Sequence, residues 1–164
     1  MLPVTEADIR ASFVNCSKGD ANRLTVPKDL TERPWEDLDF LGWGDPTLRG
    51  RCYIVVPGED NLSLTGVALR YSTGGNGRAQ MCTICKTTHT GGGVSLMTAQ
   101  KAGESGRRGN TIGIYMCTDL ACSLYARNKR RPAAGNRYRE SLTLDEKVER
   151  VRGNISSFVA GLHN

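Results

Sequence analysis

The apolar positions of this chain fall into short runs in its first hundred residues and repeat at helical spacing near its C-terminus. Residues 52–56 form an apolar run, and residues 62–71 follow it across a turn rich in Pro, Gly, Asp and Asn. This pattern predicts a hairpin made of a buried strand and its partner. The C-terminal repeat predicts a helix from residue 143 to residue 161, with one apolar face that packs on the sheet. That face comprises Leu144, Val148, Val151, Ile155, Phe158 and Leu162.

The first twenty residues carry the signals of a helix start and stop. Thr5 and Asp8 form a variant of the capping box, with Asp in place of Glu. The helix they predict ends at Gly19, and its inward face is formed by Ile9, Phe13 and Cys16. Cys16 and Cys52 have no nearby cysteine, so both are interpreted as small core residues.

Glycine and proline punctuate the chain on both sides of the predicted hairpin. Residues 24–34 hold two prolines among charged residues and predict an irregular connector. Residues 38–46 predict a short apolar strand that ends in a turn, with Trp43 buried in the core. The turn is assigned to Gly42, Gly44 and Pro46. After the hairpin, residues 78–81 predict a last short strand.

The strongest chemical signal is two close cysteine pairs: Cys82 with Cys85, and Cys117 with Cys122. A pair on a tight turn can direct both sulfurs at one ion, and a second pair completes a tetrahedron around Zn²⁺. The chain between the pairs predicts two strands, at 94–98 and 111–116, around a glycine-rich loop, and a helix is predicted to begin near the second pair. A knuckle, a hairpin and a helix in this order make a treble clef. The predicted cofactor is one structural zinc ion, because four protein ligands leave no position for water.

Three alternatives compete with this interpretation of the cysteines. Two disulfides conflict with an N-terminus that does not resemble a secretory signal. A redox Cys-x-x-Cys motif explains Cys82 and Cys85 but leaves the second pair without a role. His89 is a reserve ligand that could replace a thiolate, although a polar loop histidine is more often solvated.

These elements together predict an α+β fold: a small antiparallel sheet with flanking helices and a treble-clef zinc finger. One domain is expected over residues 1–164. Within it, residues 1–80 form an N-terminal lobe of a helix and a β-hairpin, residues 81–130 form the zinc-finger lobe, and residues 140–164 hold the C-terminal helix. The hydrophobic content of 38% suits a modest core, to which zinc is expected to add stability.

Positive charge is concentrated in one segment. The net charge is +5, and residues 127–139 contain no acid but hold Arg127, Lys129, Arg130, Arg131, Arg137 and Arg139. Such a segment favours an anionic partner such as ribosomal RNA, with Tyr125 or Tyr138 available for base stacking. No apolar run is long enough to span a membrane, and the first residues lack the apolar core of a signal peptide. A soluble, cytoplasmic protein is therefore expected.

The sequence lacks readable catalytic motifs. Its only histidines are His89 and His163, and no nucleophile stands beside a base at a readable spacing. The glycines at 91–93 lack the Gly-Lys-Ser/Thr ending of a phosphate-binding P-loop. We therefore expect no enzyme activity and no small-molecule substrate.

Several motifs, taken in order and spacing, resemble the elongation factor G-binding family, to which the FusB-type fusidic acid resistance proteins belong. The motifs are Phe40-Leu-Gly-Trp43, the strand Tyr53-Ile-Val55, Met81-Cys-Thr-Ile-Cys85, Val94-Ser-Leu-Met97, Tyr115-Met-Cys117 and Cys122. The resemblance covers most of residues 8–158. It implies the C-terminal treble-clef domain of that family.

The resemblance also implies a function and a set of site residues. Family members bind elongation factor G and help it leave the ribosome when a drug traps it there. Their zinc ligands correspond to the four paired cysteines, and their partner surface corresponds by position to Arg107, Arg108, Tyr115 and Phe158. Two hypotheses from other classes remain: a nucleic-acid-binding zinc finger that uses residues 127–139, and a thiol redox sensor that releases zinc on mild oxidation.

Overall fold

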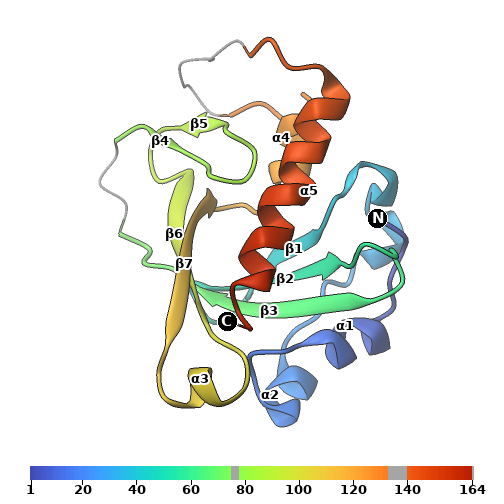
Figure 1. The fold of residues 1–164 in the computed structure, drawn as a ribbon, viewed down its shortest axis with the longest axis vertical. Helices are drawn as coiled ribbons and strands as arrows, with labels where there is room; N and C mark the ends of the chain where they lie inside the picture. Colours follow the sequence, from blue (N-terminus) through green and yellow to red (C-terminus); the bar gives the residue numbers. More distant parts are fainter. Residues whose placement is uncertain (75–77, 133–139, 164) are drawn as a thin grey trace.

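An antiparallel sheet of five strands forms the centre of the molecule, in the order β1-β2-β3-β6-β7 (Figure 1). The computed structural model describes residues 1–74, 78–132 and 140–163. The five strands are β1 (Leu41–Gly44), β2 (Arg51–Pro57), β3 (Leu64–Arg70), β6 (Val94–Gln100) and β7 (Thr111–Cys117). A separate two-stranded sheet encloses the first cysteine pair and consists of β4 (Gln80–Met81) and β5 (Thr88–His89).

Helices pack on both faces of the five-stranded sheet. The longest helix, α5 (Leu144–Ala160), lies across one face, and α1 (Glu6–Ser12) packs on β3 from the other side (Figure 1). The shorter helical elements are α2 (Lys18–Arg23), α3 (Gly103–Arg107), α4 (Cys122–Ala126) and the 3-10 turns η1 (Leu30–Glu32) and η2 (Trp35–Asp37). The α+β class predicted from the sequence is therefore confirmed.

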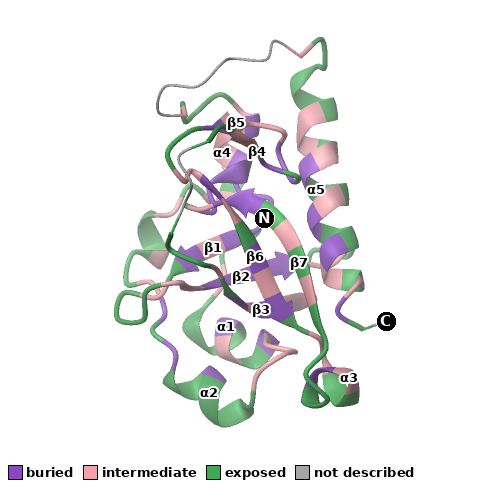
Figure 2. Ribbon diagram, turned by 90° about the vertical axis from the view of Figure 1, so that its left-hand side faces the viewer, coloured by how far each residue is buried: buried purple, intermediate pink, exposed green. Residues whose placement is uncertain are grey.

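Strand β2 joins two hydrophobic cores that lie on opposite faces of the sheet. Successive side chains of a strand point to opposite faces. Ile54 accordingly belongs to the core beneath α5, while Tyr53 and Val55 belong to the core beneath α1. Because both sides are covered, every residue from Cys52 to Val56 is buried, as the purple central strands of Figure 2 show. The predicted hairpin of β2 and β3 is confirmed, with Ile54 opposite Val67.

The first helix begins where the sequence predicts and ends earlier. Thr5 caps α1, and its capping box with Asp8 is present. The prediction that Gly19 ends this helix is wrong, because the chain leaves the helix at Phe13 to form a bridge with Gly66 of β3. A Cβ atom on Gly66 would lie 2.5 Å from Ser12 Oγ, so this close approach requires glycine.

The predicted turn at Gly42 and Gly44 is also wrong, since both residues lie within β1. The chain turns later, at Asp45, whose carboxylate accepts hydrogen bonds from the backbone N–H groups of Thr47 and Leu48. Trp43 is buried as predicted, and its Nε1 donates to the Thr25 carbonyl at 2.9 Å. The glycine-rich loop of the β6–β7 hairpin is not irregular throughout, because it contains the short helix α3.

Helix α5 confirms the C-terminal prediction and settles the position of Phe158. Thr143 caps the helix through a capping box with Glu146. Val151, Ile155 and Phe158 of this helix are buried, and so is Leu162 just after its end. The prediction that Leu144 packs on the sheet with them is wrong, because Leu144 in the first turn is 53% exposed. Because only 5% of Phe158 is exposed and it belongs to the core beneath α5, the partner-contact role implied by the family resemblance does not fit this residue.

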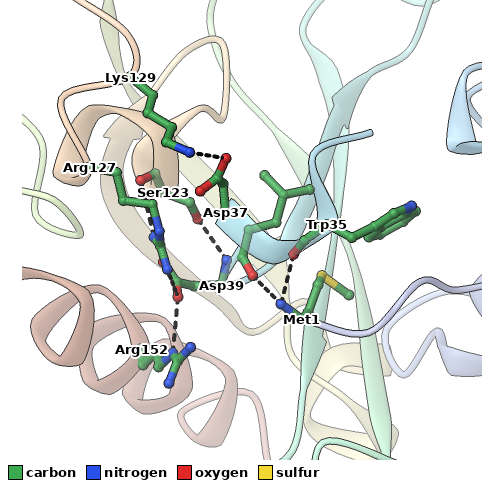
Figure 3. A network of polar contacts seen from close by, with 9 residues as sticks. Met1, Trp35, Asp37, Asp39, Ser123, Arg127, Lys129 and Arg152 are labelled. Atoms are coloured by element: carbon green, nitrogen blue, oxygen red, sulfur yellow. Dashed lines mark hydrogen bonds and ion pairs between the residues drawn. The ribbon is translucent and has the colours of Figure 1, made fainter. Parts of the chain in front are cut away.

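A buried aspartate ties the connector before β1 to two helices (Figure 3). The Asp39 side chain is fully buried and accepts charge-assisted hydrogen bonds from Arg127 after α4, at 2.5 and 2.9 Å. Arg152 of α5 donates to the same carboxylate at 3.0 Å. The Asp39 backbone N–H also donates to Ser123 Oγ at 3.0 Å. A buried carboxylate requires this degree of compensation, because an unpaired charge inside a protein is strongly unfavourable.

Two cations of the segment assigned to RNA binding are engaged in ion pairs with acids before β1. The Arg127 side chain is 9% exposed and points inward to Asp39, so its assignment as an RNA contact does not fit its position. Lys129 is paired with Asp37 at 2.7 Å (Figure 3). The other members are Arg130 and Arg131, which lie on the surface, and Arg137 and Arg139, which lie outside the described residues together with Tyr138.

Replacing Asp39 with asparagine should destabilise the fold by about 3 kcal/mol, because it leaves the buried Arg127 guanidinium without its counter-charge. Urea unfolding at neutral pH measures this free energy. The matched control is Asp37→Asn, which removes an ion pair to a half-exposed lysine and should cost less than about 1 kcal/mol. Equal losses in the two variants would contradict the role given to Asp39.

Candidate metal centre

Four cysteine side chains from two distant parts of the chain meet inside the protein. All four are buried, and their sulfur atoms lie within 4.8 Å of one another. The Sγ atoms of Cys82 and Cys122 are 3.7 Å apart, and those of Cys85 and Cys117 are 3.5 Å apart. Each of these close contacts joins one loop to the other, so the cluster holds the two loops together.

The sulfur spacing fits one zinc ion and does not fit disulfides. A zinc–thiolate bond of about 2.3 Å places sulfurs at the corners of a tetrahedron about 3.8 Å apart, whereas bonded sulfurs lie about 2.05 Å apart. The six cysteines all have free thiols. The donor set is complete for a structural zinc ion, since four thiolates fill its tetrahedron. The predicted structural zinc site is thus supported by geometry as well as by spacing.

Both cysteine loops contain a residue with left-handed backbone geometry, which turns the chain sharply enough to aim two sulfurs at one point. Lys86 has φ of 62° directly after Cys85, and its N–H donates to the Cys82 carbonyl at 3.0 Å. Leu120 has φ of 59° between the second pair, and its N–H donates to the Cys117 carbonyl at 2.9 Å. Neither residue is glycine, so each is held in an uncommon conformation by its surroundings.

Gly42 of β1 receives the second cysteine loop. A Cβ atom on Gly42 would lie 2.6 Å from Leu120 Cβ, a distance that non-bonded carbons do not tolerate. Leu120 therefore rests on the bare backbone of β1, in a place that any side chain at Gly42 would fill. Sequence reasoning assigned this glycine to a turn and missed its packing role.

His89 is buried beside the cluster and is not the solvated loop histidine that composition favours. Its Nε2 lies 3.3 Å from Cys117 Sγ, and its ring meets the Tyr125 ring edge-on at a centroid distance of 4.7 Å. The four sulfurs already complete a tetrahedron. Its position is therefore that of a hydrogen-bonding neighbour that orients a ligand.

The close packing of the sulfurs shifts the pKa values of the cysteine thiols in opposite directions. Hydrogen bonds from Cys117 and Cys122 lower the pKa of the Cys82 thiol far below its ordinary value. Complete burial, followed by hydrogen bonding to Cys117, raises the pKa of the Cys122 thiol well above its ordinary value. Without a cation the cluster can thus ionise only in part, because several thiolates in contact repel one another. A divalent ion that binds all four sulfurs displaces the remaining protons.

The residues implied as a partner surface occupy two ends of one hairpin. Tyr115 of β7 is 44% exposed and lies two residues before the ligand Cys117. Arg107 and Arg108 lie in and directly after α3, at the far end of the β6–β7 hairpin (Figure 1). Arg108 is paired with Glu104 in the same helix. The structure therefore brings Tyr115 to the metal centre and leaves the arginines at the hairpin tip.

Replacing Cys117 with alanine should abolish zinc binding and the cooperative unfolding of the domain. Structural zinc in small peptides contributes about 10–16 kcal/mol, which is comparable to the whole stability of an ordinary domain. Native mass spectrometry reports the metal content, and calorimetry reports the unfolding transition. Cys16→Ala, outside the cluster, should keep both. A Cys117→Ala protein with undiminished zinc and an unchanged transition would contradict the ligand assignment.

Replacing His89 with phenylalanine should keep one zinc ion per chain but lower zinc affinity roughly tenfold to a hundredfold, as loss of a ligand-orienting partner does. Phenylalanine retains the ring packing against Tyr125 and removes only the contact to sulfur. Competition with a chromophoric chelator measures the affinity. The control His163→Phe, on the surface, should leave it unchanged. Loss of all zinc from His89→Phe would instead show that the imidazole is itself a ligand.

Comparison with known proteins agrees with this geometry. Residues 8–162 match the family model described as the FBP C-terminal treble-clef zinc-finger. The curated proteins and the solved structures contain no significant match to the chain. Among the residues that the structure describes, none of the helices has the length and apolar character to cross a membrane. Since the match spans almost the whole sequence and includes the four clustered cysteines, the chain belongs to the FBP C-terminal treble-clef zinc-finger family, the domain of FusB-type proteins.

Proposed function

We propose that this protein is a non-catalytic, zinc-dependent adaptor that binds translation elongation factor G and promotes its release from the ribosome. Family membership supports this proposal. The sequence motifs imply elongation factor G as the partner of this family, and the family model matches residues 8–162 of the chain. The observation that carries it is an exposed apolar pair on the zinc-anchored hairpin. Leu96 of β6 and Tyr115 of β7 are paired across the strands, and each is about half exposed, at 45% and 44%.

The apolar pair lies on the α1 side of the sheet, at β6 and β7, which α1 and the core beneath it do not reach among the described residues. On the opposite face, Met97 and Ile114 are paired across the same strands and pack in the core beneath α5. Helix α1 packs on β3, and its core does not extend to β6 or β7. A sheet face open to water usually carries polar residues, so large apolar side chains there favour a contact surface.

Neighbouring residues extend this surface at both ends of the hairpin. Leu96 lies over Gly113, whose added Cβ would be 3.2 Å from Leu96 Cδ1. Met81 is 48% exposed, and Thr83, two residues later, donates its N–H to the Tyr115 carbonyl at 2.8 Å. Arg107 is exposed at the hairpin tip. The proposed partner surface therefore consists of an apolar centre with Met81, Leu96 and Tyr115, and a basic rim at Arg107.

Zinc acts on this surface by fixing the end of the hairpin. Cys117 ends β7, two residues from Tyr115, so binding of the ion fixes the strand that carries the aromatic ring. A preorganised surface loses less conformational entropy on binding than a mobile one. An adaptor of this kind shifts a trapped complex only if it binds the released state of elongation factor G more tightly than the ribosome-bound state.

The nucleic-acid hypothesis loses part of its basis in this structure. Of the six basic residues from 127 to 139, Arg127 and Lys129 are paired with the acids of the connector before β1. Direct binding through the whole segment is therefore the weaker proposal for the main activity.

The double variant Leu96→Ala/Tyr115→Ala should weaken binding to purified elongation factor G at least about thirtyfold, because one aromatic anchor at the centre of an interface contributes about 2 kcal/mol or more. Both side chains are half exposed, so the melting temperature should change little. Isothermal titration calorimetry measures the affinity, at low and at high salt.

The matched control is Leu62→Ala, since Leu62 is a highly exposed leucine in the β2–β3 turn, away from the hairpin. Its affinity should equal that of the unaltered protein. Absence of binding to elongation factor G at every salt concentration would refute the proposed partner. An unchanged affinity in the double variant would refute the proposed surface.

A further inference from the structure

A cavity of about 470 Å³ opens beside the zinc centre, between the first cysteine loop, the segment after α4 and the first turns of α5. It is separate from the apolar surface of the β6–β7 hairpin. The residues that matter for its chemistry are Lys86, Tyr125, Arg130, Arg131, Lys147 and Arg150. Three parts of the chain that are far apart in sequence thus line one cavity.

The cavity is strongly basic. Among the described residues that line it, five are basic and one, Glu140, is acidic. That single acid is already engaged, because both its oxygens accept hydrogen bonds from Arg150, at 2.7 and 2.9 Å. Its charge is therefore compensated within the wall, and it does not neutralise the remaining cations.

Three of these cations form no ion pair with any described residue: Lys86, Arg131 and Lys147. Arg130 is partly occupied, with Nε 3.4 Å from Asp119 and its guanidinium over the Tyr125 ring. Like charges that face one cavity repel one another, so their convergence is unfavourable unless an anion enters.

The backbone at Lys86 adds to this argument. Its φ of 62° belongs to the left-handed region, where glycine is the residue without strain. A glycine would form the same cysteine loop at lower conformational cost and would remove the ammonium group. The lysine therefore gains nothing for the metal loop itself, and its side chain lines the cavity.

The wall behind the cations is held rigidly. The Tyr125 hydroxyl donates to Asp119 at 2.8 Å, and the Tyr125 ring packs edge-on against the ring of the buried His89. Arg150 is fixed by Glu140 and donates to the Cys85 carbonyl at 2.9 Å. A rigid wall keeps the cavity open without a ligand, which lowers the entropy cost of binding.

We propose that this cavity binds a phosphate group, carried either by a nucleic acid or by a small phosphorylated ligand. A phosphate offers several acceptor oxygens and up to two negative charges, which matches three unpaired cations from three directions better than a carboxylate does. The site is independent of the proposed contact with elongation factor G, since it lies on other residues. Either proposal can therefore fail alone.

The test uses the zinc-loaded full chain and two probes, inorganic pyrophosphate and a fluorescein-labelled single-stranded RNA oligonucleotide. Lys86→Gly and Lys147→Gln should each weaken binding of the ligand at least about fivefold, because each removes a charge-assisted hydrogen bond. Lys86→Gly should keep or raise the melting temperature, since it relieves the left-handed lysine. Lys147 lies on α5, away from the metal ligands, so its variant tests the site without altering the cysteine loop.

The control is Lys28→Gln, which makes the same charge change at an exposed site in the connector. Binding of RNA that pyrophosphate does not displace identifies a nucleic-acid phosphate, and binding of pyrophosphate alone identifies a small ligand. Both results support the site if the cavity variants weaken binding and Lys28→Gln does not. The proposal is overturned if neither probe binds, if the cavity variants bind as the unaltered chain does, or if Lys28→Gln weakens binding equally.

Discussion

The fold of this protein depends on one constraint: four cysteine sulfurs must lie close enough together to bind one metal ion. The sulfurs come from the loop inside the small β4–β5 sheet, from the last residue of β7 and from the start of α4. Four thiols in contact cannot all ionise without a cation, so the four-thiolate form of the cluster requires a metal ion at its centre. The cysteines are also part of the hydrophobic core beneath α5. Metal binding and core packing are therefore one cooperative event, and the edge strand β7 ends at the ion.

Charged residues serve two different purposes in this fold. The buried Asp39 carboxylate binds two arginines, the buried Arg127 and the largely exposed Arg152, and joins the connector before β1 to α4 and α5. Around the cavity beside the zinc centre the balance is reversed, because cations converge there with too few acids. A buried pair fixes the positions of elements, whereas an uncompensated group of surface charges makes a site for something from outside. The basic residues of this chain thus include one group that binds the buried Asp39 carboxylate and another group that lines the cavity beside the zinc centre.

The parts of the fold that could be predicted are those encoded by local patterns. The cysteine spacing predicted the cluster, the helical repeat predicted α5, and the turn between two apolar runs predicted the β2–β3 hairpin. The parts that could not be predicted depend on contacts between distant residues. Asp39 finds Arg127 across 88 positions of sequence, and nothing near either residue indicates the other. Gly42 was assigned to a turn because the sequence around it does not indicate that Leu120 packs on it.

Exposure was the other property that local patterns could not give. Phe158 continues a helical stripe and is buried, whereas Leu96 sits in an equally apolar strand and is half exposed. The difference lies in which faces of the sheet receive a helix: α5 covers one face of β6 and β7, and α1 stops at β3 on the other. That arrangement follows from tertiary packing, which no window of neighbouring residues contains.

The contact between Leu120 and Gly42 has a consequence for the order in which this protein is assembled. Ribosomes make a chain from its N-terminus, so the strand that holds Gly42 leaves the exit tunnel well before the loop that rests on it. Gly42 is therefore already outside the tunnel when the last cysteines emerge, and the metal loop can close on it as the core forms. The order of synthesis thus favours closure of the metal centre, because the residue that receives the second cysteine loop is made before that loop.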